Sequence, residues 1–171
     1  MTVLHTVLST YAETHRVLAR RRDELETDLI RALDDGDSAL TDSLHEALGT
    51  ASAMVWINTE AHFLLVFAQF ESLVTELAAT AIETGRRHPD AAARRAWQVL
   101  YDRARQSVQA LPFLDRMALL LDKGDSAYQA IRDIYQKRNH VAHGSPLSEM
   151  IDVMELAEQL QAIAARLQEP R

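Results

Sequence analysis

A short stretch between residues 134 and 144 contains side chains that can act on a phosphate group. Arg138 can donate two parallel hydrogen bonds to a phosphate and can stabilise the charge that develops on it during a reaction. His143 follows five residues later, and a histidine titrates near neutrality, so it can take up or release a proton. Such a pair can direct a ribose 2′-hydroxyl at its own phosphodiester without a metal ion.

The helix expected before this stretch turns Arg138 toward the protein interior. Ala127, Ile131 and Ile134 form an apolar stripe at helical spacing, and position 138 continues that stripe. Because an unpaired charge is very costly in the interior, Arg138 requires either a buried carboxylate or an anionic ligand. The stripe therefore marks Arg138 as a candidate site residue.

The relative direction of the Arg138 and His143 side chains depends on where that helix ends. In an uninterrupted α-helix the two side chains would point roughly 140° apart. The sequence Gly-Ser-Pro at 144–146 predicts that the helix ends here, with Arg138 in its last turn, His143 just beyond, and both facing one cleft. Asn139 lies four residues before His143, where its side chain can hydrogen-bond the imidazole and fix its orientation.

The segment from Arg138 to His143 reads Arg-Asn-His-Val-Ala-His and is followed by Gly144. It resembles the signature motif of the HEPN superfamily, in which an arginine and a directly following asparagine precede a histidine by a few residues. HEPN domains are helical bundles that dimerise so that two such motifs face each other. Many of them are endoribonucleases that act as toxins, antiphage effectors or CRISPR-associated nucleases. The resemblance covers residues 51–171, and only the motif itself is specific.

The resemblance implies a role for each polar side chain of the motif. His143 would be the general acid or base. Arg138 would bind the phosphate and stabilise the transition state. Asn139 would orient the site, and His140 would make a secondary contact. Two copies of the motif across a dimer axis would supply both a base and an acid.

The resemblance extends to an earlier helix and departs from one subgroup of the family. Residues 67–73, Phe-Ala-Gln-Phe-Glu-Ser-Leu, look like the family's earlier core helix, whose acidic or polar residue often lies near the site, so Glu71 is the expected supporting residue. Toxins restrained by a nucleotidyltransferase antitoxin usually carry a tyrosine where this chain has Ser145, so that mode of control is not expected. The implied partners are a second copy of the chain, an RNA substrate and an antitoxin or regulatory protein, with no cofactor and no metal ion.

Three other interpretations of these residues stay open. A non-catalytic HEPN-like dimer would use the site to bind a nucleotide, an RNA or a protein. In a plain helical interaction module, Arg138 would only neutralise Glu71. His140 and His143 also resemble part of a metal site, which would need a third ligand such as His62 or Glu71.

The composition of the 171 residues limits the possible functions. The net charge of −7 argues against coating nucleic acid by bulk electrostatics but is compatible with one locally basic pocket. The absence of cysteine excludes disulfides and cysteine nucleophiles. The most apolar stretch, Ala61 to Phe70, is shorter than the roughly 18 uncharged residues of a membrane span, and the N-terminus does not resemble a signal peptide. We therefore expect a cytoplasmic protein that does not bind membranes.

Helical spacing dominates the chain and period-two alternation is essentially absent, so we expect an all-α fold. Residues 1–36 form a long, heptad-like first helix suited to an oligomerising or regulatory role, with its basic cluster, Arg20 to Arg22, on a solvated face. Residues 37–171 would form an up-and-down, HEPN-like bundle. The whole chain would contain roughly five to seven helices, at about 4–34, 38–48, 52–84, 91–110, 112–123, 126–143 and 145–167.

Local signals set the expected helix ends. Asp90 is an expected N-cap, as is Asp125 or Ser126. Ser145-Pro146 reads as an N-cap followed by proline at the first helical position, and Gly49 predicts a bend or cap. The last helix carries a regular apolar stripe, formed by Val153, Leu156, Leu160, Ile163 and Leu167.

Overall fold

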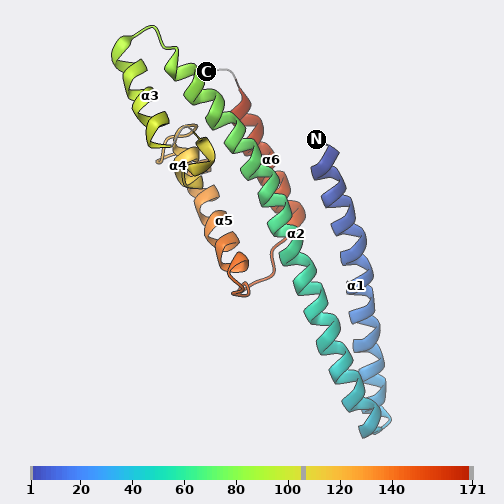
Figure 1. Cartoon of the computed structure of the whole chain (residues 1–171). Helices are drawn as coiled ribbons and strands as arrows, with labels where there is room; N and C mark the ends of the chain where they lie inside the picture. The colour runs from blue at the N-terminus through green and yellow to red at the C-terminus, as the bar shows by residue number, and fades with distance from the viewer. Residues whose placement is uncertain (1, 105–106, 170–171) are drawn as a thin grey trace. The chain divides into compact units, whose positions relative to one another are not determined.

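The computed structural model describes residues 2–104 and 107–169, and within these residues it contains helices and connecting segments but no strand. The predicted all-α helical bundle of five to seven helices is confirmed. The α-helices are α1 (Thr2–Asp34), α2 (Ser38–Arg86), α3 (Ala91–Arg103), α4 (Phe113–Ala118), α5 (Ser126–Ala142) and α6 (Val153–Gln168), and a 3₁₀ turn, η1, spans Val108–Ala110 (Figure 1).

The chain divides into two compact units, and both α2 and α6 pass from one unit into the other. Unit 1 comprises Met1–Val66 and Pro146–Leu156, and unit 2 comprises Phe67–Ser145 and Ala157–Arg171. The boundary predicted after residue 36 falls at the turn between α1 and α2, which lies inside unit 1. Unit 1 therefore combines α1 with the first half of α2.

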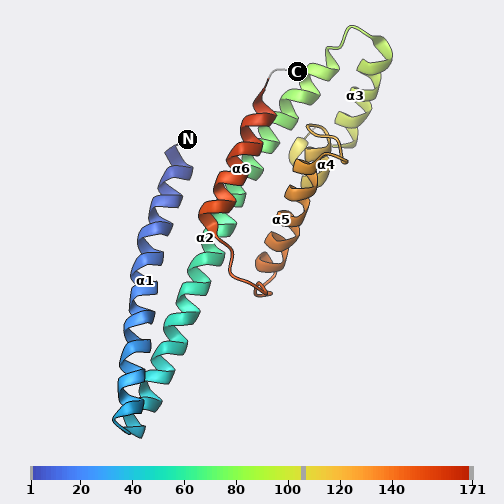
Figure 2. The ribbon, with the colours of Figure 1, turned by 180° about the vertical axis from the view of Figure 1, so that it is seen from behind.

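Within unit 1, α1 and the first half of α2 form an antiparallel hairpin (Figures 1 and 2). Gly36 makes the turn with a φ of 70°, a left-handed conformation that glycine adopts without strain. The Tyr11 and His62 rings lie 5.3 Å apart, and the Thr14 hydroxyl donates to Asn58 Oδ1 at 3.1 Å. Nearer the turn, the buried apolar side chains of the hairpin are Leu25, Leu29, Ala32, Ala51 and Val55.

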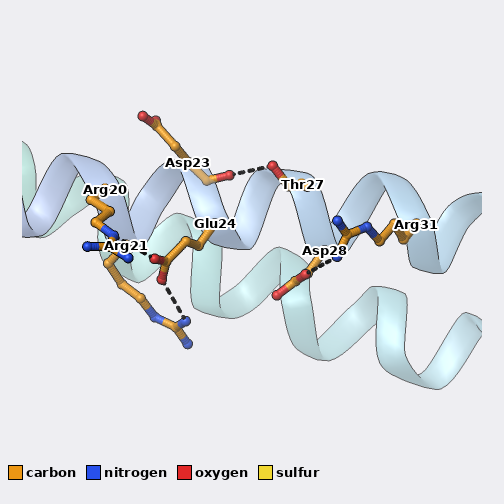
Figure 3. Close-up of polar contacts among 7 residues, drawn as sticks. All are labelled: Arg20, Arg21, Asp23, Glu24, Thr27, Asp28 and Arg31. Atoms are coloured by element: carbon orange, nitrogen blue, oxygen red, sulfur yellow. Dashed lines mark hydrogen bonds and ion pairs between the residues drawn. The ribbon is translucent and has the colours of Figure 1, made fainter.

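Helix α1 carries a series of ion pairs within the helix, part of which is drawn in Figure 3. Arg20 Nε donates to Glu24 Oε1 at 2.9 Å, and Arg21 Nη1 lies 3.7 Å from Glu24 Oε2. Arg22 Nη2 pairs with Asp23 Oδ1 at 2.8 Å. The expectation that Arg20 to Arg22 lie on a solvated face is confirmed for Arg20 and Arg21, which are exposed, while Arg22 is partly buried. Neighbouring carboxylates offset the positive charge of this cluster.

Within unit 2, an aromatic cluster joins α2, α4 and α5. The Phe113 ring centroid lies 5.2 Å from that of Phe67, 6.5 Å from that of Phe70 and 4.9 Å from that of Tyr135. Aromatic pairs at these separations contribute to stability beyond the area that they bury. The cluster fixes the α4 segment against the two longer helices. Further buried apolar residues of unit 2 include Val74, Ala78, Ile82, Met117, Ile131, Ile134, Leu160, Ile163 and Leu167.

Two predicted helix boundaries are wrong. The predicted break near Gly49 is absent, because α2 runs through this position without interruption. A glycine inside a helix costs only about 1 kcal/mol, and Ala51 and Val55, which follow it, are buried. The last helix begins at Val153 and not at Ser145-Pro146, since the Asp152 carboxylate accepts hydrogen bonds from the first turn of α6. The predicted apolar stripe of this helix is confirmed as buried.

The predicted helices at 91–110 and 112–123 are both shorter in the structure. The first, α3, ends at Arg103, and the chain then forms a 3₁₀ turn at Val108–Ala110; residues 105 and 106 lie outside the described part of the chain. The second, α4, ends at Ala118. Leu120 and Leu121, which follow its end, are both buried.

By length and composition alone, α2 is long and apolar enough to cross a membrane, although core helices of soluble proteins meet the same criterion. In the 18-residue apolar window of α2, 33% of the residues are buried.

Candidate functional site

Helix α5 positions the candidate site, and its start is fixed by a cap. The Asp125 carboxylate accepts a hydrogen bond from the Ala127 backbone N–H at 2.8 Å, so Asp125, one of the two predicted residues, is the N-cap. The predicted apolar stripe is confirmed, since Ala127, Ile131 and Ile134 are buried. Arg138 continues the stripe as predicted, and 34% of its side chain is exposed. Its guanidinium is therefore held by the protein and still reachable from solvent.

The C-terminal end of α5 has the hydrogen bonds of a Schellman motif. Ser145 N donates to His140 O at 3.0 Å, and Gly144 N donates to Val141 O at 2.9 Å. Gly144 adopts a φ of 77°, the left-handed conformation that this motif requires. The predicted end of the helix is thus confirmed, with His143 as its C-cap residue. The motif leaves the His143 and His140 side chains exposed.

Asn139 contacts a different partner from the one expected. The Arg138 Nη1 group donates to Asn139 Oδ1 at 3.1 Å, so this side-chain oxygen orients the arginine and not the imidazole of His143. Asn139 and His143 are joined through their main chains, with His143 N donating to Asn139 O at 3.1 Å. The structure brings Arg138 and Asn139 together, and His140 and His143 are exposed at the same helix end. Because α5 is helical through Ala142, positions 138 and 143 remain roughly 140° apart, and the break that would turn both side chains into one cleft does not occur between them.

Glu71 lies next to Arg138, as the sequence suggests for a supporting residue. Its Oε2 atom lies 3.7 Å from Arg138 Nη2, a distance suited to an ion pair but longer than a hydrogen bond. The Glu71 side chain is 25% exposed, and α2 holds it within unit 2. A carboxylate thus neutralises part of the Arg138 charge without a close, bidentate contact.

Arg116 is a further member of the site that the sequence analysis does not identify. Its Nη2 group donates to Glu71 Oε1 at 2.8 Å, and its Nη1 group hydrogen-bonds the hydroxyl of Thr75. The residue is 7% exposed, and its guanidinium lies 5.8 Å from the centroid of the Phe113 ring. The spacing offers one signal, because position 116 falls three residues after Phe113 and therefore on the same face of a short helix.

Two guanidinium groups therefore share one carboxylate. With both arginines charged and Glu71 ionised, the group carries a net charge of +1 at the partly exposed end, where Arg138 lies. Such an excess favours binding of a phosphate or another anion. Across the described residues, no group of three or more His, Asp or Glu side chains is arranged to hold a metal ion, so His140 and His143 do not gain the third ligand that a metal site requires.

Comparisons of the chain with protein-family models, with characterised proteins and with solved structures found no match.

Proposed function

We propose that this protein is a metal-independent endoribonuclease of the HEPN type, with Arg138 and His143 as its catalytic residues. The observation that carries the proposal is the Schellman motif at the end of α5, which exposes His143 one turn beyond a partly exposed Arg138. The partly exposed Arg138 guanidinium can bind a phosphate, and the exposed His143 imidazole can exchange protons. The resemblance of residues 138–143 to the HEPN motif supports the same assignment.

The proposed reaction is an attack of the ribose 2′-oxygen on the adjacent phosphorus atom. His143 of one copy takes the proton of the 2′-hydroxyl as the new P–O bond forms. The bond from phosphorus to the 5′-oxygen of the next nucleotide breaks, and His143 of a second copy gives that oxygen a proton. Arg138 stabilises the negative charge on the phosphate oxygens during this step. The products are a 2′,3′-cyclic phosphate and a 5′-hydroxyl end.

The roles of the other residues follow from their contacts. Asn139 and Glu71 orient Arg138, and the exposed His140 of the same helix end would make a secondary contact with RNA. A homodimer in the cytoplasm completes the proposed site. As a toxin or antiphage effector, the enzyme would be restrained by an antitoxin or regulatory protein.

The test of this proposal is cleavage of a mixed RNA pool in EDTA. His143→Ala should lower the cleavage rate by roughly 10²- to 10⁴-fold, the usual contribution of a general acid or base. His140→Ala is the matched control, since it removes an exposed imidazole from the same helix end, and we expect a change of less than about tenfold for this supporting contact. Product ends are identified by mass spectrometry, with 2′,3′-cyclic phosphate as the expected species.

A second candidate function is a non-catalytic, HEPN-like dimer that binds a nucleotide, an RNA or a protein. The ion pair between Arg138 and Glu71 favours it, because the carboxylate offsets part of the charge that catalysis would use. Absence of cleavage by the folded, dimeric wild-type protein would support this candidate and count against the ribonuclease.

A substitution at Gly144 tests whether the helix end positions His143. Gly144→Ala should cost roughly 1–2 kcal/mol in the free energy of unfolding, because alanine disfavours a φ of 77°. A Cβ atom here would meet nothing within 4 Å, so the cost comes from the backbone alone. Gly36→Ala is the matched control, with a φ of 70° and equal space. Both variants should lose similar stability in urea unfolding, and only Gly144→Ala should slow RNA cleavage by folded protein. Equal cleavage rates in the two variants would argue against a role for this helix end.

A further inference from the structure

The two arginines that share Glu71 are bound to it unequally. Arg116 donates a hydrogen bond of 2.8 Å to Oε1, while Arg138 lies 3.7 Å from Oε2. The side chain of Arg116 is 9% exposed, and that of Arg138 is 34% exposed. The closer and more buried contact is the stronger one, because water screens it less. The carboxylate is therefore mainly neutralised by Arg116.

The position of Arg116 is itself fixed by contacts on several sides. It hydrogen-bonds the Thr75 hydroxyl as well as Glu71, and both of these residues lie on α2, one turn apart. Its helix, α4, is held by Phe113 in the aromatic cluster of unit 2. Arg116 thus binds Glu71 from a rigid part of the core, and this contact limits how closely the carboxylate can approach Arg138.

We infer that Arg116 is a positioning residue, which holds the Glu71 carboxylate away from a close pair with Arg138 and so leaves Arg138 available to one phosphate group. The inference rests on the proposed function for the identity of that phosphate, an RNA phosphodiester. Without Arg116, Glu71 would be free to form a bidentate pair with Arg138 and compete directly with the ligand. With Arg116 present, the carboxylate orients Arg138 through one longer contact.

The experiment measures binding of inorganic phosphate to the full chain by NMR, through the side-chain Nε signal of Arg138, which Arg138→Met assigns by its disappearance. Glu71→Gln removes the competing charge and keeps an oxygen that can accept from Arg116. Its phosphate affinity should therefore rise by roughly twofold to fivefold, as expected for loss of one partly exposed ion pair. Arg116→Met should lower the affinity, and Arg116→Lys, which keeps the charge, should restore it.

If Arg116→Met does not fold, phosphate affinity is measured in the double variant Glu71→Gln/Arg116→Met. This variant should fold, because it leaves no unpaired charge in the core. It should bind phosphate as tightly as Glu71→Gln. The matched control is Asp133→Asn, which removes one negative charge from the same helix as Arg138, at an exposed carboxylate paired with Arg132. At physiological salt its affinity should equal that of the wild type.

Unchanged phosphate affinity in Glu71→Gln and in the double variant would overturn the inference, since a purely structural Arg116–Glu71 pair has no effect on the ligand. Absence of phosphate binding in every protein would overturn it as well. A parallel titration with a 2′-O-methyl RNA, which cannot be cleaved, separates this inference from the proposed function. Phosphate affinities that rise in Glu71→Gln, fall in Arg116→Met and recover in Arg116→Lys would confirm the role of Arg116. If the wild type then bound no RNA, the proposed ribonuclease activity would be contradicted.

Discussion

Arg116→Met is expected to lower the free energy of unfolding by about 3–5 kcal/mol, the usual effect of breaking a buried ion pair from one side. The substitution removes the 2.8 Å hydrogen bond of Arg116 to Glu71, so the carboxylate must shift within unit 2 to pair with Arg138 alone. Arg138→Met should cost less than about 1 kcal/mol, because Arg138 is partly exposed and Glu71 keeps its hydrogen bond to Arg116. Urea unfolding followed by circular dichroism measures both changes.

The stability changes of Arg116→Met and Arg138→Met also distinguish between the functional interpretations of Arg138. In a ribonuclease, Arg138→Met folds normally and loses RNA cleavage. In a plain helical interaction module, Arg138 would serve only to neutralise Glu71, and its loss would cost as much stability as the loss of Arg116. The control for the loss of an exposed α5 arginine is Arg132→Met, whose side chain is 45% exposed, and it should leave stability nearly unchanged. Equal, large losses of stability in Arg116→Met and Arg138→Met would favour the interaction module.

Much of the fold was predictable because its signals are local or periodic. The Asp90 carboxylate accepts from Ala93 N at 2.7 Å and caps α3 as expected, and Asp125 does the same for α5. The apolar stripes of α5 and α6 are buried where the helical period places them. These features depend on residues only a few positions apart, and one sequence displays them directly.

The wrong boundaries arise where two local signals compete or where packing overrides one. Ser145-Pro146 is a good helix start by sequence, yet Asp152 caps α6 seven residues later than Ser145. The segment between them includes Leu147, whose backbone N–H donates to Glu60 Oε1 at 3.1 Å. That contact joins residues far apart in the sequence, and no sequence pattern near position 147 predicts it.

The candidate site was predictable in part for the same reason. The helical stripe gave Arg138 an inward direction, and the resemblance of residues 67–73 to a HEPN core helix gave Glu71 as the supporting residue, which the structure places beside Arg138. Arg116 escaped detection because its contacts with Glu71 and Thr75 join positions more than forty residues apart. The requirement that a buried charge be paired applies equally to position 116, but only the packing of α4 shows that this arginine is buried.

Glycines in α2 show how one residue type can have opposite roles in one helix. Gly49 is open, and a Cβ atom there would meet nothing within 4 Å. At Gly85, near the other end of the helix, a Cβ atom would lie 2.2 Å from Cδ2 of Trp97. Gly49 predicts a bend or cap, and the helix expected at 52–84 ends just before Gly85, yet α2 passes through both positions and ends at Arg86. The physical requirement at Gly85 is the close approach of the Trp97 ring from α3.

Gly85→Ala should therefore destabilise the protein by about 2–3 kcal/mol, since the added methyl group overlaps three atoms of the indole ring and forces it to move. Gly49→Ala is the matched control in the same helix, and it should stabilise the protein by roughly 0.5–1 kcal/mol, because alanine favours the helical conformation and nothing obstructs its side chain. Urea unfolding measures both. In a double-mutant cycle, Trp97→Ala should remove most of the additional cost of Gly85→Ala, because the clash needs the indole ring. Two results would contradict this explanation: a Gly85→Ala variant that is more stable than the wild type, or an equal loss of unfolding free energy when Trp97 is replaced by alanine. Either would show that the Trp97 ring of α3 does not restrict the size of the side chain at position 85.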